Sequence, residues 1–428
     1  MKHPNTSRRK RVLVIGGGGR EHVLVWALAK SPQVSKVFAL PGNAGIAGEP
    51  KVTPILCPAD HRSVVEAAKQ RSVDLVVIGP EAPLVDGMTD ALEDAGILVF
   101  GPRQRGAMLE GSKSFAKDLM TQYGIPTAPY RHFDDLGSAE TYIQEHPLPV
   151  VVKADGLAAG KGTLVAETHA EAIVFAEAKL ASHRRIVVEE FLEGEEATFT
   201  CLVSGGRFVS WPTTQDHKRL LESDCGPMTG GMGAYSPAPA VDEDLHVRII
   251  AEVITPLLRG LEIEMIPYTG FLYVGLKIVN GEPYVLEFNC RLGDPEAQPL
   301  LMRLQDDLFP ILYGAARGKF YPTRWDPRPA VCVVLAAHGY PDNPRQGDQI
   351  SGLDALVGQE DIKVFHAGTK FHNSALVTEG GRVLGVTAMG TTVREARERV
   401  YTAIEKIYFE GMQYRLDIGW RAVVREVT

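Results

Sequence analysis

The stretch PVVVKADGLAAGKGTLVAE, residues 149–167, places two short β-branched runs on either side of a glycine-rich loop. This pattern predicts a β-hairpin. The loop superficially resembles a Walker A motif, but only three residues separate Gly156 from Gly160, and Gly162 replaces the Ser or Thr. We therefore expect a flexible flap over a nucleotide, with backbone amides and Lys153 against phosphate oxygens. A mobile surface hairpin is the alternative for the glycines alone, and Lys153 counts against it.

A polar strand face is predicted further along, at VLEFNCRLGDPE, residues 285–296. Side chains alternate in a strand, so Glu287, Asn289 and Arg291 share one face. The carboxylate and the amide oxygen suit Mg²⁺, which takes one or two carboxylates plus substrate phosphates, and Arg291 could clamp a phosphoryl or carboxylate oxygen. A solvent-facing polar edge is the alternative. The acids of the following GDPE are either solvated turn residues or groups that orient Arg291.

The segment TTQDHKRLLESDCGPMTGGMGAYSPAP, residues 213–239, is long and rich in Gly and Pro. Irregular segments of this length are usually binding loops or disordered. For His217 we prefer an exposed loop histidine. Asp216 is better placed to hold an ammonium group, on charge type alone.

The first third of the chain alternates apolar strand-like runs with helical stretches, which predicts a parallel α/β sheet. Ligands of such sheets bind beyond the carboxyl ends of the strands. Three loops fall there: GGGGREH (16–22), PGNAG (41–45) and GPEAPL (79–84). The first loop is equally consistent with a phosphate-binding loop and with a tight glycine turn that binds no ligand. A dinucleotide fingerprint fails, because Glu21 occupies its third glycine position.

Composition limits the class of protein. The 428 residues suffice for about three domains, and 45 Lys+Arg against 53 Asp+Glu argue against nucleic acid or a membrane surface as the partner. Five scattered cysteines without zinc-like spacing fit a reducing, cytoplasmic setting. No apolar run approaches the roughly 20 residues of a membrane span, and the basic MKHPNTSRRKR at 1–11 is interpreted as a disordered, solvated lead-in.

The last part of the chain begins after a Pro-rich passage, PTRWDPRPA at 322–330, which indicates a domain boundary. Strand-like runs follow it. A helix is then expected to open at Thr392, with Glu395 three residues on in a capping-box spacing.

These segments and several others carry a resemblance that spans Val12 to about Val424. The motifs GGGGREH, PGNAG, GPEAPL, EGSKSFAKD, KADGLAAGKG, EEFLEGEEATF, QDHKR, TGGMGAYSP, VLEFNCRLGDPE, VFHAGTK and DIGWRA are similar to those of the phosphoribosylamine–glycine ligases, also called glycinamide ribonucleotide synthetases, of the ATP-grasp superfamily. The resemblance implies α/β and α+β architecture: an N-terminal parallel α/β domain (1–110), a two-lobed ATP-grasp middle (111–325, flap lobe about 125–200) and a small C-terminal α+β domain (326–428).

The resemblance also implies the site residues. ATP would contact Lys113, Lys153 and the flap residues Gly160, Lys161 and Gly162, with the hinge Glu189, Glu190 and Leu192 on adenine and Glu195 or Glu196 on ribose. Mg²⁺ or Mn²⁺ would bind Glu287 and Asn289. The catalytic set would be Arg291, Asp216, Lys218 and Asp294, with Asp216 and Arg291 on glycine and the transferred phosphoryl group. Phosphoribosylamine would meet Gly18, Gly19, Arg20, Asn43, Glu81 and Pro83.

The implied reaction joins glycine to 5-phosphoribosylamine through glycyl phosphate, giving glycinamide ribonucleotide, ADP and phosphate in purine biosynthesis. Two departures from related sequences stand out: Met228 replaces an amide beside Cys225, and Gly275 takes the place of a further metal carboxylate found in ATP-grasp carboxylases. Another ATP-grasp ligase or carboxylase that uses bicarbonate, and a non-catalytic ATP-binding regulatory protein, are the alternatives. The oligomeric state stays open, with a monomer preferred.

Overall fold

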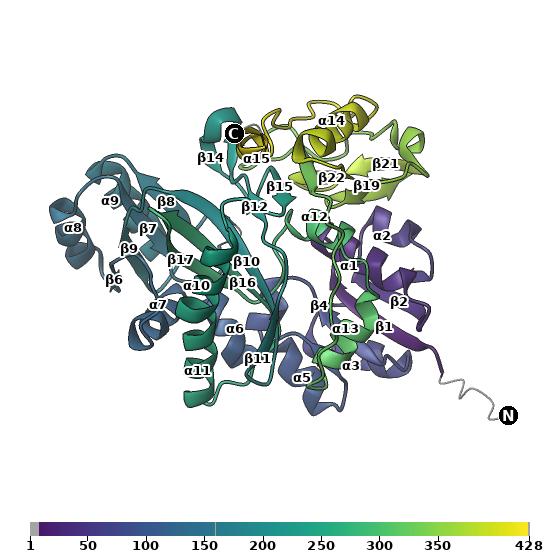
Figure 1. The fold of residues 1–428 in the computed structure, drawn as a ribbon, viewed down its shortest axis with the longest axis horizontal. Coiled ribbons are helices and arrows are strands. Elements are labelled where there is room, and N and C mark those ends of the chain that lie inside the picture. The colour runs from purple at the N-terminus through teal and green to yellow at the C-terminus, as the bar shows by residue number, and fades with distance from the viewer. Residues whose placement is uncertain (1–7, 159, 427–428) are drawn as a thin grey trace.

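The computed structural model describes residues 8–158 and 160–426. Its N-terminal part is a five-stranded sheet in the order β3-β2-β1-β4-β5, and every pairing is parallel, as the alternating pattern predicts. Figure 1 shows this sheet on the right, with helices around it. The elements are β1 (Lys10–Gly16), α1 (Gly19–Lys30), β2 (Val34–Pro41), α2 (Ala44–Gly48), β3 (Val52–Pro54), α3 (His61–Gln70), β4 (Leu75–Ile78), α4 (Glu81–Val85), α5 (Met88–Asp94) and β5 (Val99–Phe100).

The expected lead-in at residues 1–11 is only partly covered, because residues 1–7 lie outside the described residues. For Lys10 and Arg11 the expectation is wrong, since both belong to β1. The Lys10 ammonium lies 3.1 Å from the Asp74 carboxylate, and the Arg11 amide donates to the same carboxylate at 2.9 Å. Pairing of β1 with β2 and the contacts with Asp74 therefore order these basic residues.

The flap lobe is a four-stranded antiparallel sheet in the order β6-β9-β7-β8 with two helices packed on it. The predicted hairpin at 149–167 is confirmed, because β7 and β8 pair antiparallel. In Figure 1 this lobe projects to the left. Its elements are β6 (Tyr130–Phe133), α8 (Leu136–Glu145), β7 (Val150–Ala154), β8 (Thr163–Ala166), α9 (His169–Leu180) and β9 (Ile186–Glu190).

The second lobe is a four-stranded antiparallel sheet in the order β11-β10-β16-β17. Helices before the flap lobe and between β15 and β16 share its apolar core with the N-terminal sheet. The elements are α6 (Gln104–Gly111), α7 (Lys113–Gln122), β10 (Glu195–Ser204), β11 (Arg207–Ser210), α10 (Glu243–Ile249), a π-helical segment (Ile250–Ile254), α11 (Thr255–Ile263), β16 (Thr269–Val279) and β17 (Glu282–Asn289).

The C-terminal sheet combines strands from two distant parts of the chain. Its order is β12-β15-β18-β22-β19, so β15 from the 213–239 segment pairs with β18 beyond residue 329, and β12 joins the sheet at its edge through β15. The helix predicted at Thr392 is confirmed, with the Thr392 hydroxyl accepting from the Glu395 amide. The elements are β12 (Gln215–Asp216), β15 (Gly233–Ser236), β18 (Ala330–Ala336), a 3₁₀ turn (Leu353–Leu356), β19 (Ile362–His366), β20 (Thr369–His372), β21 (Ala375–Thr378), β22 (Arg382–Met389), α14 (Val393–Ile404) and α15 (Trp420–Arg425).

Two further helices, α12 (Ala297–Met302) and α13 (Leu308–Ala315), follow β17. Their apolar residues share a core with the N-terminal sheet, so the chain returns to its first domain before it forms the remaining strands of the C-terminal sheet.

The 213–239 segment is not irregular, which corrects the sequence expectation. Between β12 and β15 it forms a small hairpin of β13 (Arg219–Leu221) and β14 (Cys225–Met228) around a 3₁₀ turn (Glu222–Asp224). His217, expected to be exposed, is 1% exposed. Among the described residues, no helix is long and apolar enough to cross a membrane.

Candidate active site

A cleft of about 540 Å³ lies where the flap lobe, the second lobe, the N-terminal loops and the C-terminal sheet meet. Its wall is dense with charge of both signs. Cationic lining residues are Arg20, Lys113, Lys117, Lys153, Lys218, Lys277, Arg291 and Arg382, and acidic ones are Glu81, Glu110, Glu189, Glu190, Glu196, Asp216, Glu287, Asp294 and Glu296. Many of the predicted site residues therefore converge on one cavity.

The flap covers this cleft from one side. Gly160 lies against the backbone of the glycine-rich loop between β14 and β15, so a Cβ there would be 3.5 Å from the Gly230 nitrogen. Gly162 packs on Ala158, where a Cβ would come within 2.5 Å of the methyl group. Lys161 points elsewhere: its ammonium lies 3.9 Å from the Asp342 carboxylate and is half-exposed.

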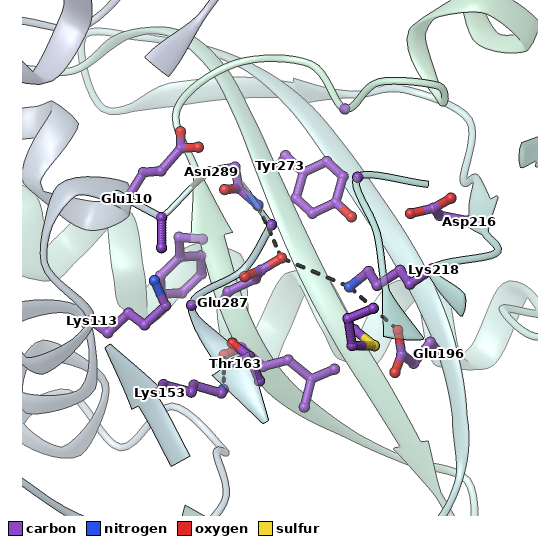
Figure 2. A pocket seen from close by; sticks show the side chains of 18 of the residues that line it. Glu110, Lys113, Lys153, Thr163, Glu196, Asp216, Lys218, Tyr273, Glu287 and Asn289 are labelled. Carbon is purple, nitrogen blue, oxygen red and sulfur yellow. Dashed lines mark hydrogen bonds and ion pairs between the residues drawn. The ribbon is translucent and has the colours of Figure 1, made fainter. Parts of the chain in front are cut away.

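Two lysines line the cleft below the flap. The Lys113 ammonium donates to the Gly156 carbonyl at 3.1 Å, and burial lowers its pKa. The Lys153 ammonium donates to the Leu286 carbonyl at 3.1 Å and to the Glu189 carboxylate at 2.9 Å. Figure 2 shows Lys113 and Lys153 on the same side of Glu287. They present two positive charges where a polyphosphate would enter.

Sequence reasoning missed the third lysine of this group. The Lys117 ammonium lies 3.0 Å from the Glu189 carboxylate, and burial lowers the Lys117 pKa to about 8. Glu189 is 2% exposed, and its other carboxylate oxygen has no hydrogen-bond partner among the described residues. The available signal was helical spacing, since Lys117 follows Lys113 by one turn of α7. The hinge residues Glu190 and Leu192 line the cleft as expected.

The two residues predicted as alternatives for ribose binding, Glu195 and Glu196, lie in different surroundings. Glu196 lines the cleft and pairs with Lys218 at 3.3 Å and with Lys277 at 3.6 Å. Glu195 is not among the lining residues that the structure describes, and the Arg425 guanidinium binds its two oxygens at 3.0 and 2.6 Å.

The predicted metal pair lies side by side on β17 (Figure 2). The Asn289 amide nitrogen is 3.4 Å from the Glu287 carboxylate. Burial opposes ionisation of Glu287, but Lys218 and Lys113 outweigh it and lower its pKa to about 2. Two oxygen-bearing side chains, one of them ionised, fit a hard divalent cation. The amide would have to turn, because its oxygen now faces Arg291 at 3.2 Å.

The rest of the metal shell must come from outside these two side chains. Gly275 lies opposite Glu287 in the β16–β17 ladder, and a Cβ there would be 3.1 Å from Glu287 Cγ. No cluster of three His, Cys, Asp or Glu suited to a metal occurs in residues 8–158 and 160–426. Substrate phosphates are the natural source of further oxygens.

Arg291 faces the cleft, so the alternative interpretation of this strand face as a solvent-facing polar edge is wrong. Phe288 and Cys290, on the opposite face of the strand, are 1% and 2% exposed. The Arg291 guanidinium donates to the Glu110 carboxylate at 2.6 Å and lies 3.3 Å from that of Glu81. Glu110 is a second residue that the sequence did not reveal, and burial raises its pKa.

Asp294 does not orient Arg291, which is one of the two roles predicted for it. Its carboxylate accepts from the Arg20 amide at 3.3 Å and from the Gln298 amide at 2.8 Å, and it lies 3.7 Å from the Arg382 guanidinium. Glu110 and Glu81 orient Arg291 instead.

Asp216 is the least satisfied acid of the cleft. One carboxylate oxygen is buried and has no hydrogen-bond partner among the described residues. Burial and the nearby Glu296 raise its pKa well above the usual range. Lys218, two residues on, bridges Glu196 and Glu287, with its ammonium 3.8 Å from the Glu287 carboxylate (Figure 2). A cation that enters beside Asp216 would complete this charge arrangement.

The amides of the first glycine loop are already occupied. The Gly18 amide donates to Glu21 at 2.6 Å, and the Arg20 amide faces Asp294. The Asn43 side chain donates to the Gly17 and His366 carbonyls, each at 2.8 Å. Of the predicted phosphoribosylamine residues that the structure describes, Arg20 and Glu81 line the cleft, while Gly18, Gly19, Asn43 and Pro83 do not.

Two lining residues come from the C-terminal part and carry no sequence signal of their own. The Arg382 guanidinium donates to the Gly230 and Asp294 carbonyls. The Tyr340 hydroxyl accepts from the Gly230 amide at 2.9 Å. Both hold the glycine-rich loop that contains Met228, a residue that also lines the cleft.

A glycine-rich hairpin above lysines, across a cleft from an acid, an amide and an arginine on one strand, defines an ATP-grasp fold and site. Comparison with known proteins agrees. The phosphoribosylglycinamide synthetase family matches the chain over its N domain at residues 10–110, its ATP-grasp (A) domain at 111–297 and its C domain at 330–421.

The chain belongs to the phosphoribosylglycinamide synthetase family. A phosphoribosylamine–glycine ligase of Allochromatium vinosum is 50% identical over 97% of this chain and 99% of its own length, and one of Vibrio cholerae is 49% identical over the same shares. The crystal structure of the phosphoribosylamine–glycine ligase of Thermotoga maritima has a TM-score of 0.82 at 36% identity, over 96% of this chain and 100% of that one. A biotin carboxylase domain of Hydrogenobacter thermophilus, at 17% identity and a TM-score of 0.73 over 95% and 92%, shares the fold.

Proposed function

We propose that this chain joins glycine to 5-phosphoribosylamine at the expense of ATP, giving glycinamide ribonucleotide, ADP and phosphate in purine biosynthesis. The relatives named above support the overall reaction. The carrying observation from the site is that Glu287, Asn289 and Arg291 face Lys113 and Lys153 across one cleft.

The first step is transfer of the γ-phosphoryl group to a glycine carboxylate oxygen. The new P–O bond replaces the bond to ADP, and the product is glycyl phosphate. Such transfer depends mainly on in-line positioning and charge neutralisation. Lys113 and Lys153 hold the phosphates, and Arg291 neutralises the oxygens of the group in transit.

Glu287 and Asn289 would hold Mg²⁺ or Mn²⁺, and the bound ion would offset the negative charge of the phosphates. Adenine lies against the hinge at Glu190 and Leu192. Glu196, which lines the cleft, is the better of the two ribose candidates.

Glycine arrives as a zwitterion, and the cleft offers a group for each end. The unpartnered carboxylate oxygen of Asp216 takes the ammonium group. Arg291, held by Glu110 and Glu81, faces the carboxylate. Lys218 favours the ionised forms of Glu196 and Glu287, and Asp294 fixes the position of Arg20 and Arg382.

The second step is attack of the phosphoribosylamine nitrogen on the acyl carbon. The amide bond forms, phosphate leaves with the C–O bond electrons, and the nitrogen loses a proton. Arg20 and Glu81 place this substrate at the N-terminal rim, with Gly18, Gly19, Asn43 and Pro83 shaping the rim behind them. An acyl phosphate hydrolyses readily, so the flap and the Gly230 loop serve to exclude water. All these groups come from one chain, and we propose a monomer as the working unit.

The test is phosphate release from MgATP with glycine and freshly made phosphoribosylamine, each omitted in turn. Release should require all components and should fall when Asp216→Asn raises the KM for glycine. Release stimulated by bicarbonate, with none from glycine plus phosphoribosylamine, would instead favour an ATP-grasp carboxylase. ATP binding without any turnover would favour a regulatory protein.

A further inference from the structure

The residues of QDHK point in two directions. Asp216 and Lys218 line the active-site cleft. His217 lies between them and is buried on the other side of the strand, where its Nε2 atom accepts a hydrogen bond from the Gly419 amide at 3.2 Å. Alternation along the chain thus puts two cleft residues and one anchor into three consecutive positions.

The Gly419 amide that His217 binds belongs to the motif DIGWRA (417–422), to which the reaction assigns no role. Gly419 precedes α15, and burial lowers the pKa of His217 to about 3. The imidazole is therefore neutral and able to accept at Nε2. Arg415 and Arg421 add nearby positive charge, which acts in the same direction.

The same C-terminal segment also holds the β13–β14 hairpin. The buried Arg415 guanidinium donates to the Arg219 carbonyl and to the Asp224 carboxylate, each at 3.0 Å. Arg421 donates to the other oxygen of Asp224. The Ser223 amide donates to Asp417 at 2.9 Å, and Arg415 in turn binds Asp417 at 2.7 and 2.8 Å.

Backbone pairing holds this segment from one side only. The strand β12 comprises Gln215 and Asp216, and within its sheet it pairs with β15 alone. Backbone hydrogen bonds of His217 with Gly233 and Met232 continue this pairing beyond the end of the strand. Residues 415–421 add contacts with the His217 side chain and with the hairpin that follows it.

We infer that residues 415–421 are a positioning element for substrate binding, and that His217 transmits their position to Asp216 and Lys218. This inference rests on the proposed function, because it concerns binding of the amino-acid substrate. His217 and Arg421 act as positioning residues that do not touch the substrate themselves. Substitution of His217 or Arg421 should therefore displace Asp216 and weaken the binding of glycine more than the binding of ATP.

The test compares His217→Leu with His217→Gln in the full-length chain. Leucine removes the acceptor, whereas the glutamine amide oxygen can take the place of Nε2. Displacements of about 1 Å near reacting groups cost up to about 100-fold. We expect His217→Leu to raise the KM for glycine by about 10-fold, to leave the KM for ATP within about twofold, and to be rescued by His217→Gln.

Arg421→Ala provides a second variant, since its ion pair with Asp224 is partly exposed, and such pairs contribute little to folding. It should shift the KM for glycine in the same direction. Lys370→Ala, which breaks an exposed ion pair with Glu379 in the same part of the chain, is the matched control and should change neither KM.

If the KM for glycine and the KM for ATP rise equally, together with a lower melting temperature, His217 has a purely structural role and the inference is overturned. Unchanged kinetics in both His217→Leu and Arg421→Ala would overturn it as well. Failure of the proposed function looks different: the wild-type chain itself would show no glycine-dependent turnover.

Discussion

Arg291 is held from two sides before any substrate arrives. Glu110 and Glu81 bind its guanidinium at 2.6 and 3.3 Å, so little reorganisation is needed when negative charge develops nearby. Arg291→Ala should lower kcat by about 100- to 1000-fold and change the KM for ATP much less. Steady-state kinetics with ATP and glycine varied separately would show this. A loss confined to ATP affinity would remove the phosphoryl role from Arg291.

Glu287 is the only carboxylate of the predicted metal pair. Glu287→Gln keeps the size of the side chain but removes its charge, so the Mg²⁺ concentration for half-maximal activity should rise by at least about 10-fold. Glu282→Gln is the matched control, because Glu282 begins the same strand and pairs with Arg248 at its exposed end. Titration of activity with Mg²⁺ measures both variants. Near-wild-type activity of Glu287→Gln at low Mg²⁺ contradicts the assignment.

At the scale of elements, the loop after β14 depends on one glycine. Gly231 has φ +108°, and a Cβ there would lie 2.5 Å from Pro295 Cδ and 2.7 Å from the Asp216 carboxylate. Gly231→Ala should therefore displace Asp216 and raise the KM for glycine. Gly206→Ala is the control, since Gly206 has φ +73° with open space around it. Both variants should lose about 1–3 kcal/mol of stability from backbone strain, and an unchanged KM for glycine in Gly231→Ala would refute the packing argument.

Local patterns predicted the elements whose signals are local. Alternation placed Glu287 and Asn289 on one face, and a capping box placed the start of α14 at Thr392. The expectation for the 213–239 segment is wrong because its strands are short and because one of them, β15, pairs with a strand about 100 residues away. The burial of His217 depends on such a partner, Gly419, which no local pattern reveals. Lys117 and Glu110 escaped notice because each acts through a distant charge.

At the scale of the whole molecule, the N- and C-terminal parts meet through two histidines, of which His22 is fully buried. The His366 amide donates to His22 Nδ1 at 2.7 Å, and His22 Nε2 lies 3.2 Å from the Glu49 carboxylate, which Lys363 also contacts. Burial lowers the pKa of His22, and burial together with His22 and Lys363 lowers that of His366 to about 3. Acid should therefore loosen this contact.

The direction of this pH dependence of stability follows from proton uptake by the unfolded chain. In the unfolded chain a histidine titrates near pH 6.5, so below that pH the unfolded state binds a proton that folded His366 does not. Stability is full above about pH 6.5 and falls towards pH 3, by up to about 1.4 kcal/mol per pH unit for each such group. His366→Gln should flatten this decline in urea-unfolding free energy, whereas exposed His372→Gln should not. Parallel declines in wild type and His366→Gln would contradict the prediction.

In the proposed reaction a nucleotide and an amino-acid carboxylate meet inside the cleft that all parts of the molecule line. The most direct measurement follows the oxygen atoms of that carboxylate, with glycine labelled by ¹⁸O at both carboxylate positions and turned over with ATP and phosphoribosylamine in unlabelled water. If the carboxylate takes the γ-phosphoryl group, the released phosphate carries a single ¹⁸O and the amide keeps the other. Phosphate free of ¹⁸O, with the amide formed, would show that glycine was never phosphorylated.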